Sequence, residues 1–152
     1  MALSAQIAIS LVAHETSAGD MSRTLRVTPA AYGALLADGT SANQAQVVWS
    51  DSRTMAGSTE TLNLGGLLDV RDGATATVTI TAVKAAYAKN SHASAGISVA
   101  GGPFGSGVTL AAGAVAVLVN ASAAGMAATG VTVTGSSGAT YDIMLIGEGS
   151  VS

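Results

Sequence analysis

The sequence contains no cysteine and few charged residues. The absence of cysteine excludes disulfide bonds and thiolate metal sites. Only 10% of the 152 residues are charged, whereas about 25% are charged in an average globular chain. The 6 Lys and Arg residues are scattered along the chain, which argues against binding to nucleic acid or to an anionic membrane. We therefore expect neither of these partners, and no cofactor.

Long apolar segments are also missing. The longest candidate, residues 109–119, is interrupted by Gly113 and falls short of the roughly 18 residues that indicate a membrane span. Residues 1–12 include a short apolar run but no basic segment and no clear cleavage site. We interpret them as the start of the fold rather than as a signal peptide. The sequence thus predicts a protein that is made and folded in a cytosol.

Small apolar residues, in contrast, are abundant. Apolar residues make up 49% of the chain, although the aromatic ones are only 1 Trp, 3 Tyr and 1 Phe. A chain of this length is expected to form one domain with a real core. So few charges leave much of its surface without polar cover, and such surfaces are usually buried against other chains. We therefore expect a homo-oligomer, with a trimer as its expected form.

Apolar and polar residues alternate over most of the chain. In residues 74–89, the longest such run, threonines alternate with Ala, Val and Ile, and β-branched residues at this spacing favour a strand. Residues 6–13 place Ile7, Ile9 and Leu11 at a period of two. Further short strands are expected at residues 24–28, 44–51, 58–64, 95–100, 107–110, 114–120, 130–134 and 140–147. The pattern predicts an all-β fold, a β-sandwich or jelly roll of about eight to ten short antiparallel strands.

Local propensities and turn signals add further expectations. Residues 30–37 are expected to form a helical turn, and residues 14–22 a loop. Residues 82–89 have helical propensity in isolation, but we expect the tertiary fold to make them a strand. Residues 44–51 and 58–64 are expected to pair with each other as a hairpin.

The first strand is separated from the rest of the chain by polar residues and by Pro29. We expect one structural domain, with residues 1–36 as an N-terminal arm and residues 37–152 as a β-sandwich body. Within the arm, the candidate interface residues are Ile7, Ile9 and Leu11.

The sequence offers little support for catalysis. His14 and His92, the 2 histidines, lie in separate polar segments, so neither a metal site nor a Ser-His-Asp triad is expected. The glycine-rich residues 101–107 lack the lysine and the following helix of a phosphate loop, and a wide turn explains them better. We expect no enzymatic activity, no catalytic residue and no bound metal.

The region around the single tryptophan contains a charged pair. Asp51 and Arg53 are two residues apart, so on a strand their side chains share a face and can pair. Arg53 can also reach Glu60 across the expected hairpin. Both contacts would stabilise the fold, and the alternative is that Arg53 anchors an interface with a partner. Trp49 is expected in the core, with an interface role as its alternative.

Five short motifs follow one another along the chain. They are DGT-x-ANQA at residues 38–45, WSDSRT at 49–54, T-x-x-L-x-L at 59–64, K-x-x-x-x-K-N at 84–90 and YD-x-x-x-IG at 141–147. In order and content they resemble a group of small virion proteins encoded by tailed bacteriophages. The resemblance covers about residues 35–148, and the sequence departs from it at residues 71–73 and 111–129.

This resemblance implies a structural part of a phage particle. The leading expectation is a capsid decoration, or cement, protein that binds the major capsid protein on the outer shell and resists the internal pressure of DNA. One alternative is a tail, neck or fibre subunit of the same virion. A second alternative, from a different class, is a jelly roll that binds sugars on the host surface. In the first two cases the protein is located in the virion after synthesis in the bacterial cytoplasm.

Overall fold

The computed structural model describes residues 2–10, 13–17, 23–27, 32–71 and 73–152. These residues form strands and one short 3-10 helix, with no α-helix among them. They include no helix that is long and apolar enough to span a membrane. The all-β class expected from the sequence is confirmed.

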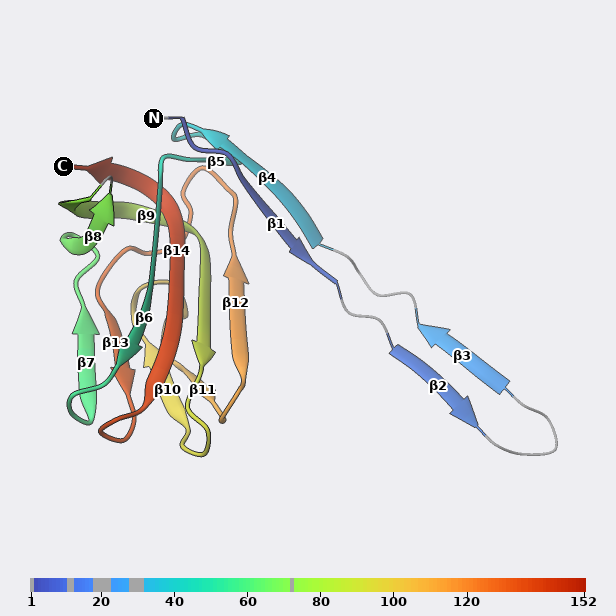
Figure 1. The fold of residues 1–152 in the computed structure, drawn as a ribbon. Coiled ribbons are helices and arrows are strands. Elements are labelled where there is room, and N and C mark those ends of the chain that lie inside the picture. The colour runs from blue at the N-terminus through green and yellow to red at the C-terminus, as the bar shows by residue number, and fades with distance from the viewer. Residues whose placement is uncertain (1, 11–12, 18–22, 28–31, 72) are drawn as a thin grey trace.

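The body consists of two sheets that face each other (Figure 1). The five-stranded sheet has the order β12-β9-β14-β6, with β8 also paired to β9. The four-stranded sheet has the order β11-β10-β13-β7. The strands of the five-stranded sheet are β6 (Val47–Thr54), β8 (Leu67–Arg71), β9 (Ala74–Asn90), β12 (Val115–Val119) and β14 (Thr140–Val151). Those of the four-stranded sheet are β7 (Thr59–Leu62), β10 (Ile97–Ala100), β11 (Val108–Leu110) and β13 (Val131–Thr134).

Alternating side chains of the two sheets meet in one core. In β6, Val47 and Trp49 are buried while Val48 lies on the other face, as the alternation of the sequence predicts. Buried side chains of β7, β10 and β13 pack against those of β9 and β14 in the same cluster. Burial of this apolar surface between the sheets is the main source of the body's stability.

The expected hairpin of residues 44–51 with 58–64 is wrong. β6 pairs with β14, whereas β7 pairs with β13 in the opposite sheet. The chain therefore crosses from one sheet to the other between Thr54 and Thr59. Leu62 and Leu64, two residues apart, are both buried. The apolar side chains of this segment are thus buried by the other sheet, and its backbone pairs with a strand that is distant in sequence.

Residues 82–89 belong to β9, which confirms the strand expected there. The pairing of β9 with β14 is irregular. Ile146 pairs with Ala85, but Gly147 pairs with Val83, so that Lys84 has no opposite residue on β14. Such a bulge inserts one extra residue into a strand and redirects the side chains on either side of it. It allows both Val83 and Lys84 to be buried, although they are consecutive.

Glycines on β14 allow the two backbones to approach at the irregular positions. A Cβ atom at Gly147 would lie 2.1 Å from the carbonyl oxygen of Ala82, and one at Gly149 would lie 1.8 Å from that of Thr79. No side chain fits at such distances unless the backbone moves. Both positions therefore require glycine.

The N-terminal strands form a paired arm. β1 (Ala5–Ile9) is antiparallel to β4 (Tyr32–Asp38), and β2 (Ala13–Ser17) is antiparallel to β3 (Arg23–Val27). Figure 1 shows β1 and β4 leading away from the sandwich, with β2 and β3 farther out. β4 also makes a short parallel contact with β5 (Gln44–Ala45). The boundary expected at residue 36 falls inside β4, and the independence of arm and body stays a prediction.

Two local expectations in this region are wrong. Residues 30–37 were expected to form a helical turn, but residues 32–38 pair with β1 as a strand. Residues 14–22 were expected to form a loop, but residues 14–17 belong to β2, and residues 18–22 lie outside the described residues. In the first case pairing with β1 outweighs the local propensity, and in the second β2 pairs with β3, the next strand along the chain.

We predict that Gly147→Ala destabilises the body by roughly 1–3 kcal/mol or more, because the new Cβ would overlap the backbone of β9. The matched control is Gly57→Ala, since no atom lies within 4 Å of a Cβ placed there. Denaturant unfolding followed by circular dichroism measures both variants. Equal midpoints for the two variants would contradict the close approach of β9 and β14.

Candidate functional site

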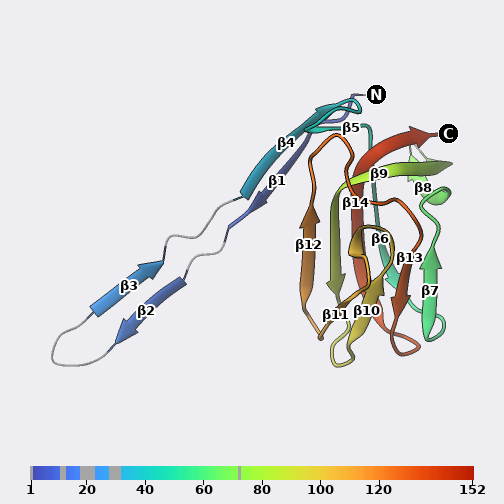
Figure 2. The same ribbon diagram turned by 180° about the vertical axis from the view of Figure 1, so that it is seen from behind.

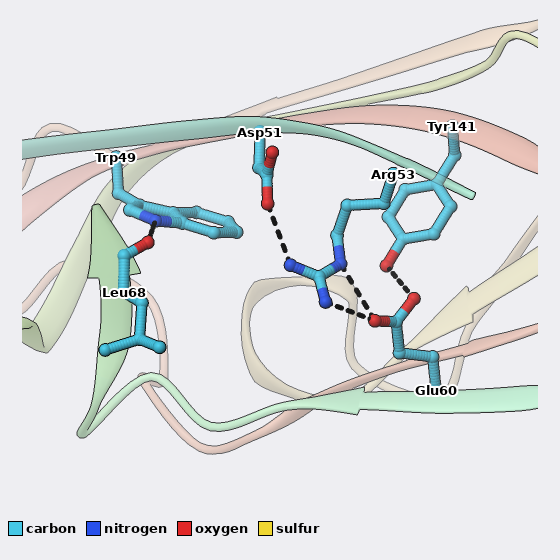
Figure 3. Close-up of polar contacts among 6 residues, drawn as sticks. All are labelled: Trp49, Asp51, Arg53, Glu60, Leu68 and Tyr141. Carbon is cyan, nitrogen blue, oxygen red and sulfur yellow. Dashed lines mark hydrogen bonds and ion pairs between the residues drawn. The ribbon is translucent and has the colours of Figure 1, made fainter. Parts of the chain in front are cut away.

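A polar cluster joins the two sheets (Figure 3). Arg53 extends from β6 and Glu60 from β7, and Arg53 Nε donates a hydrogen bond to Glu60 Oε1 at 2.8 Å. The Tyr141 hydroxyl donates to Glu60 Oε2, also at 2.8 Å. Tyr141 lies directly opposite Arg53 in the pairing of β14 with β6. One carboxylate of the four-stranded sheet thus accepts hydrogen bonds from two adjacent strands of the five-stranded sheet.

Charge and burial together set the protonation of this cluster. Burial alone would raise the pKa of Glu60, but hydrogen bonds from Arg53 and Tyr141 and the Arg53 charge lower it below its usual 4.5. The hydrogen bond to Glu60 raises the pKa of Arg53. Burial and the nearby Glu60 carboxylate raise the pKa of Tyr141. At neutral pH the cluster therefore holds an ionised Glu60 against a charged Arg53 and a neutral Tyr141.

Arg53 also pairs with Asp51, as the sequence predicted. Arg53 Nη1 lies 2.8 Å from Asp51 Oδ2. The predicted contact between Arg53 and Glu60 is confirmed as well, although it joins two sheets rather than two strands of a hairpin. Whether Arg53 also anchors a partner stays a prediction.

The core position expected for Trp49 is confirmed. Its side chain is 2% exposed, and its indole Nε1 donates to the backbone oxygen of Leu68 at 2.9 Å. This hydrogen bond satisfies the polar atom of a buried aromatic ring. It also ties β6 to β8, two strands that do not pair with each other.

The candidate interface residues of the arm have different surroundings. Ile7 packs, together with Leu3 and Ala5, against a small cluster that contains Leu36, Ala85 and Ile146. Ile9, at the outer end of β1, is 39% exposed. Leu11 lies outside the described residues. The arm is therefore packed on the five-stranded sheet at its base, and its role in a contact between chains stays a prediction.

The outer face of the five-stranded sheet carries exposed apolar side chains. Its register places Val117 of β12, Tyr87 of β9 and Met144 of β14 in one row across the strands. A shallow hollow of about 320 Å³ separates this row from Ile9 of the arm. In the next row, Asp142 accepts hydrogen bonds from the hydroxyls of Ser52 and Ser91. The hydrogen bond from Ser91 in particular lowers the pKa of Asp142.

Lys84 is a buried charged residue that the sequence reasoning missed. Its side chain is 0% exposed, and its ammonium group forms an ion pair with Glu148 Oε1 at 2.7 Å. It also donates to the backbone oxygens of Ser122 and Ala123 at 2.6 and 2.7 Å. The ammonium group thus combines one ion pair with two hydrogen bonds to backbone oxygens. The only signal in the sequence is a lysine within a run of apolar residues.

Two of the groups considered for catalysis, His92 and the glycine-rich segment, serve turns. His92 Nδ1 accepts hydrogen bonds from the backbone N–H groups of Ser94 and Ala95. The segment at residues 101–107 contains the 3-10 helix η1 (Gly102–Phe104), and Phe104 is buried in the core. The wide turn expected there fits this arrangement. The side chain of His14 is not among those described, and the described residues include no cluster of three potential metal ligands.

We predict that Glu60 makes the free energy of unfolding depend on pH in the acid range. A carboxylate whose pKa is lowered by folding contributes stability above its unfolded value, here 4.5, and loses it as the pH falls through its lower folded value. Glu60→Gln should therefore be less stable than the native protein at pH 7, and the difference should shrink below about pH 4.5. Thermal unfolding across this range measures it, with the exposed Asp38→Asn as control. A difference that stays constant with pH would contradict the ionised cluster.

We predict that Lys84→Met destabilises the protein by roughly 3–5 kcal/mol, because Glu148 and two backbone oxygens would lose their partner. Lys89→Met, on the same strand but partly exposed, should cost less than about 1 kcal/mol. Chemical denaturation compares the two variants. An unfolding midpoint unchanged by Lys84→Met would show that the ion pair adds no stability to the sandwich.

These residues make contacts within one subunit. The Arg53 cluster and the Lys84 pair connect parts of the sandwich, and the outer face and the arm expose apolar side chains. Comparisons of the chain with protein-family models, with curated proteins and with solved structures find no match.

Proposed function

We propose that the protein is a structural component of a tailed-phage virion, and specifically a capsid decoration protein. It binds the major capsid protein on the outer shell as a homo-oligomer, after synthesis in the bacterial cytoplasm. The low charge of the chain led us to expect a trimer. The proposal includes no enzymatic activity, no nucleic-acid partner and no membrane partner.

The observation that carries the proposal is the position of the phage-like motifs in the fold. Three of the five motifs lie on β6, β9 and β14, which are adjacent strands of one sheet. Their residues make buried and partly buried polar contacts of the body: Trp49, Arg53, Lys84, Asn90 and Tyr141. Motifs scattered along the sequence thus converge on one structural unit. This convergence supports a shared fold as the reason for the resemblance.

The surface of the subunit suits a role based on many repeated contacts. Apolar side chains are exposed on the outer face of the sheet, and the arm leads away from the body (Figure 1). Each contact of this kind is weak, but a lattice repeats it many times, and linkage within an oligomer makes later contacts effectively intramolecular. A small all-β subunit can stabilise a shell in this way without any catalytic group.

The sugar-binding alternative has less support. Sugar sites generally rely on exposed aromatic rings, and Trp49, Phe104 and Tyr141 are buried. Tyr32 is exposed and Tyr87 is partly exposed, but they lie on different strands, β4 and β9. The tail, neck or fibre alternative has the same structural requirements as decoration, so the location of the protein in the particle separates the two.

We predict that phage particles assembled without this protein contain DNA and tails but are less resistant to heat. Purified protein added back should bind the heads and restore the temperature at which DNA is released. DNA release followed with an intercalating dye, together with negative-stain micrographs, measures both effects. Particles that lack tails, or that have normal heat resistance, would contradict decoration, and tailless heads would favour the tail or neck role.

A further inference from the structure

β12 forms an edge of the five-stranded sheet. Among the residues that the structure describes, it pairs with β9 alone, in an antiparallel register from Val115 opposite Lys89 to Val119 opposite Ala85. Seen from behind in Figure 2, it lies at the margin of the body. One of its long edges therefore faces away from the sheet.

The pairing determines which backbone groups of β12 point outward. The backbone N–H of Asn120 donates to Lys84, and that of Asn90 donates to Ala114, at the two ends of the strand. In an antiparallel pair the residues that bond the partner strand alternate with residues that face away from it. The N–H and C=O groups of the three valines of β12, at positions 115, 117 and 119, consequently lie on the outer edge. Within the described part of the chain they have no backbone partner.

The other edges of the body are protected and β12 is not. Charged residues at a sheet edge, or very short edge strands, prevent unwanted pairing with another chain. The edge strands β6, β7 and β8 each contain charged residues, and β11 has only 3 residues. β12 reads VAVLV, with neither a charge nor a proline. Its outward side chains are exposed as well, with Val115 at 48% and Val117 at 41%.

We propose that β12 of one copy pairs antiparallel with β12 of a second copy, about a two-fold axis at Val117. Val117 then faces Val117, and Val115 faces Val119 of the other copy. The outward-facing edge of β12 is self-complementary, because each residue that would hydrogen-bond to the second copy is a valine. Pairs of β-branched residues are favourable across antiparallel strands. The result is a continuous sheet through two subunits.

This inference goes beyond the proposed virion role and does not depend on it. It concerns the purified protein in solution, whereas the virion role is tested on particles. A two-fold contact gives a dimer, in place of the trimer that the composition led us to expect.

Variants of the full chain test the contact by light scattering after size exclusion. Val117→Lys places a charge on the edge and should convert the dimer to a monomer with an unchanged circular dichroism spectrum and a melting temperature lowered only by the loss of dimerisation. Val117→Thr keeps the β-branched shape and the backbone N–H, and it should remain dimeric. Met144→Lys is the matched control, because Met144 is similarly exposed at 40% on the same face but lies on the interior strand β14. A native monomer, or a dimer dissociated by Met144→Lys but not by Val117→Lys, would overturn the proposal.

Amide hydrogen exchange measured by NMR gives a readout at single residues. The amides of Ala116 and Leu118 bond β9 and should be protected in all variants, whereas those of Val115, Val117 and Val119 should be protected only in the dimer. The reference is the native protein diluted until it is monomeric. A native oligomer in which the Val117 amide exchanges as fast as it does in that monomer would refute edge pairing. Protection that appears only when phage particles are added would assign the edge to a virion protein and overturn the pairing with a second copy.

Discussion

The antiparallel pairing of β9 with β14 is the contact on which the rest of the structure depends. β14 lies between β9 and β6, so it holds the five-stranded sheet together. The glycines of β14 let the two backbones approach at the irregular positions, and the bulge there turns Lys84 inward toward Glu148. At the other end of the strand, Tyr141 stands beside Arg53 and reaches Glu60 of the opposite sheet. The same strand thus organises both the sheet and the contact between sheets.

Some of the few charged residues pair with each other within the subunit. Arg53 with Glu60, and Lys84 with Glu148, are ion pairs that connect segments distant in sequence. The exposed surface includes large apolar side chains, among them Val115, Val117 and Met144. Apolar surfaces of this kind are commonly covered by other chains. The proposed assembly would cover such a surface.

Most strands of the body could be predicted because alternation with a period of two is a local property of the sequence, although β8 (Leu67–Arg71) was not expected. The partner of each strand could not, since β6 and β7 are consecutive in the chain but belong to different sheets. Residues 30–37 show local helical propensity, yet pairing with β1 makes residues 32–38 a strand. Within the candidate site, the Arg53 contacts followed from spacing and charge. The burial of Lys84 did not, because it depends on a bulge that Gly147 permits from another strand.

The proposed role depends on where the subunit sits in a particle. A cryo-electron microscopy map of the virion, at a resolution that separates β-strands, measures this directly. The account predicts density for the two-sheet body on the outer surface of the capsid, over junctions between major capsid proteins, with the arm extended toward a neighbouring chain. Density for this subunit in the tail alone, or its absence from the particle, would contradict the account.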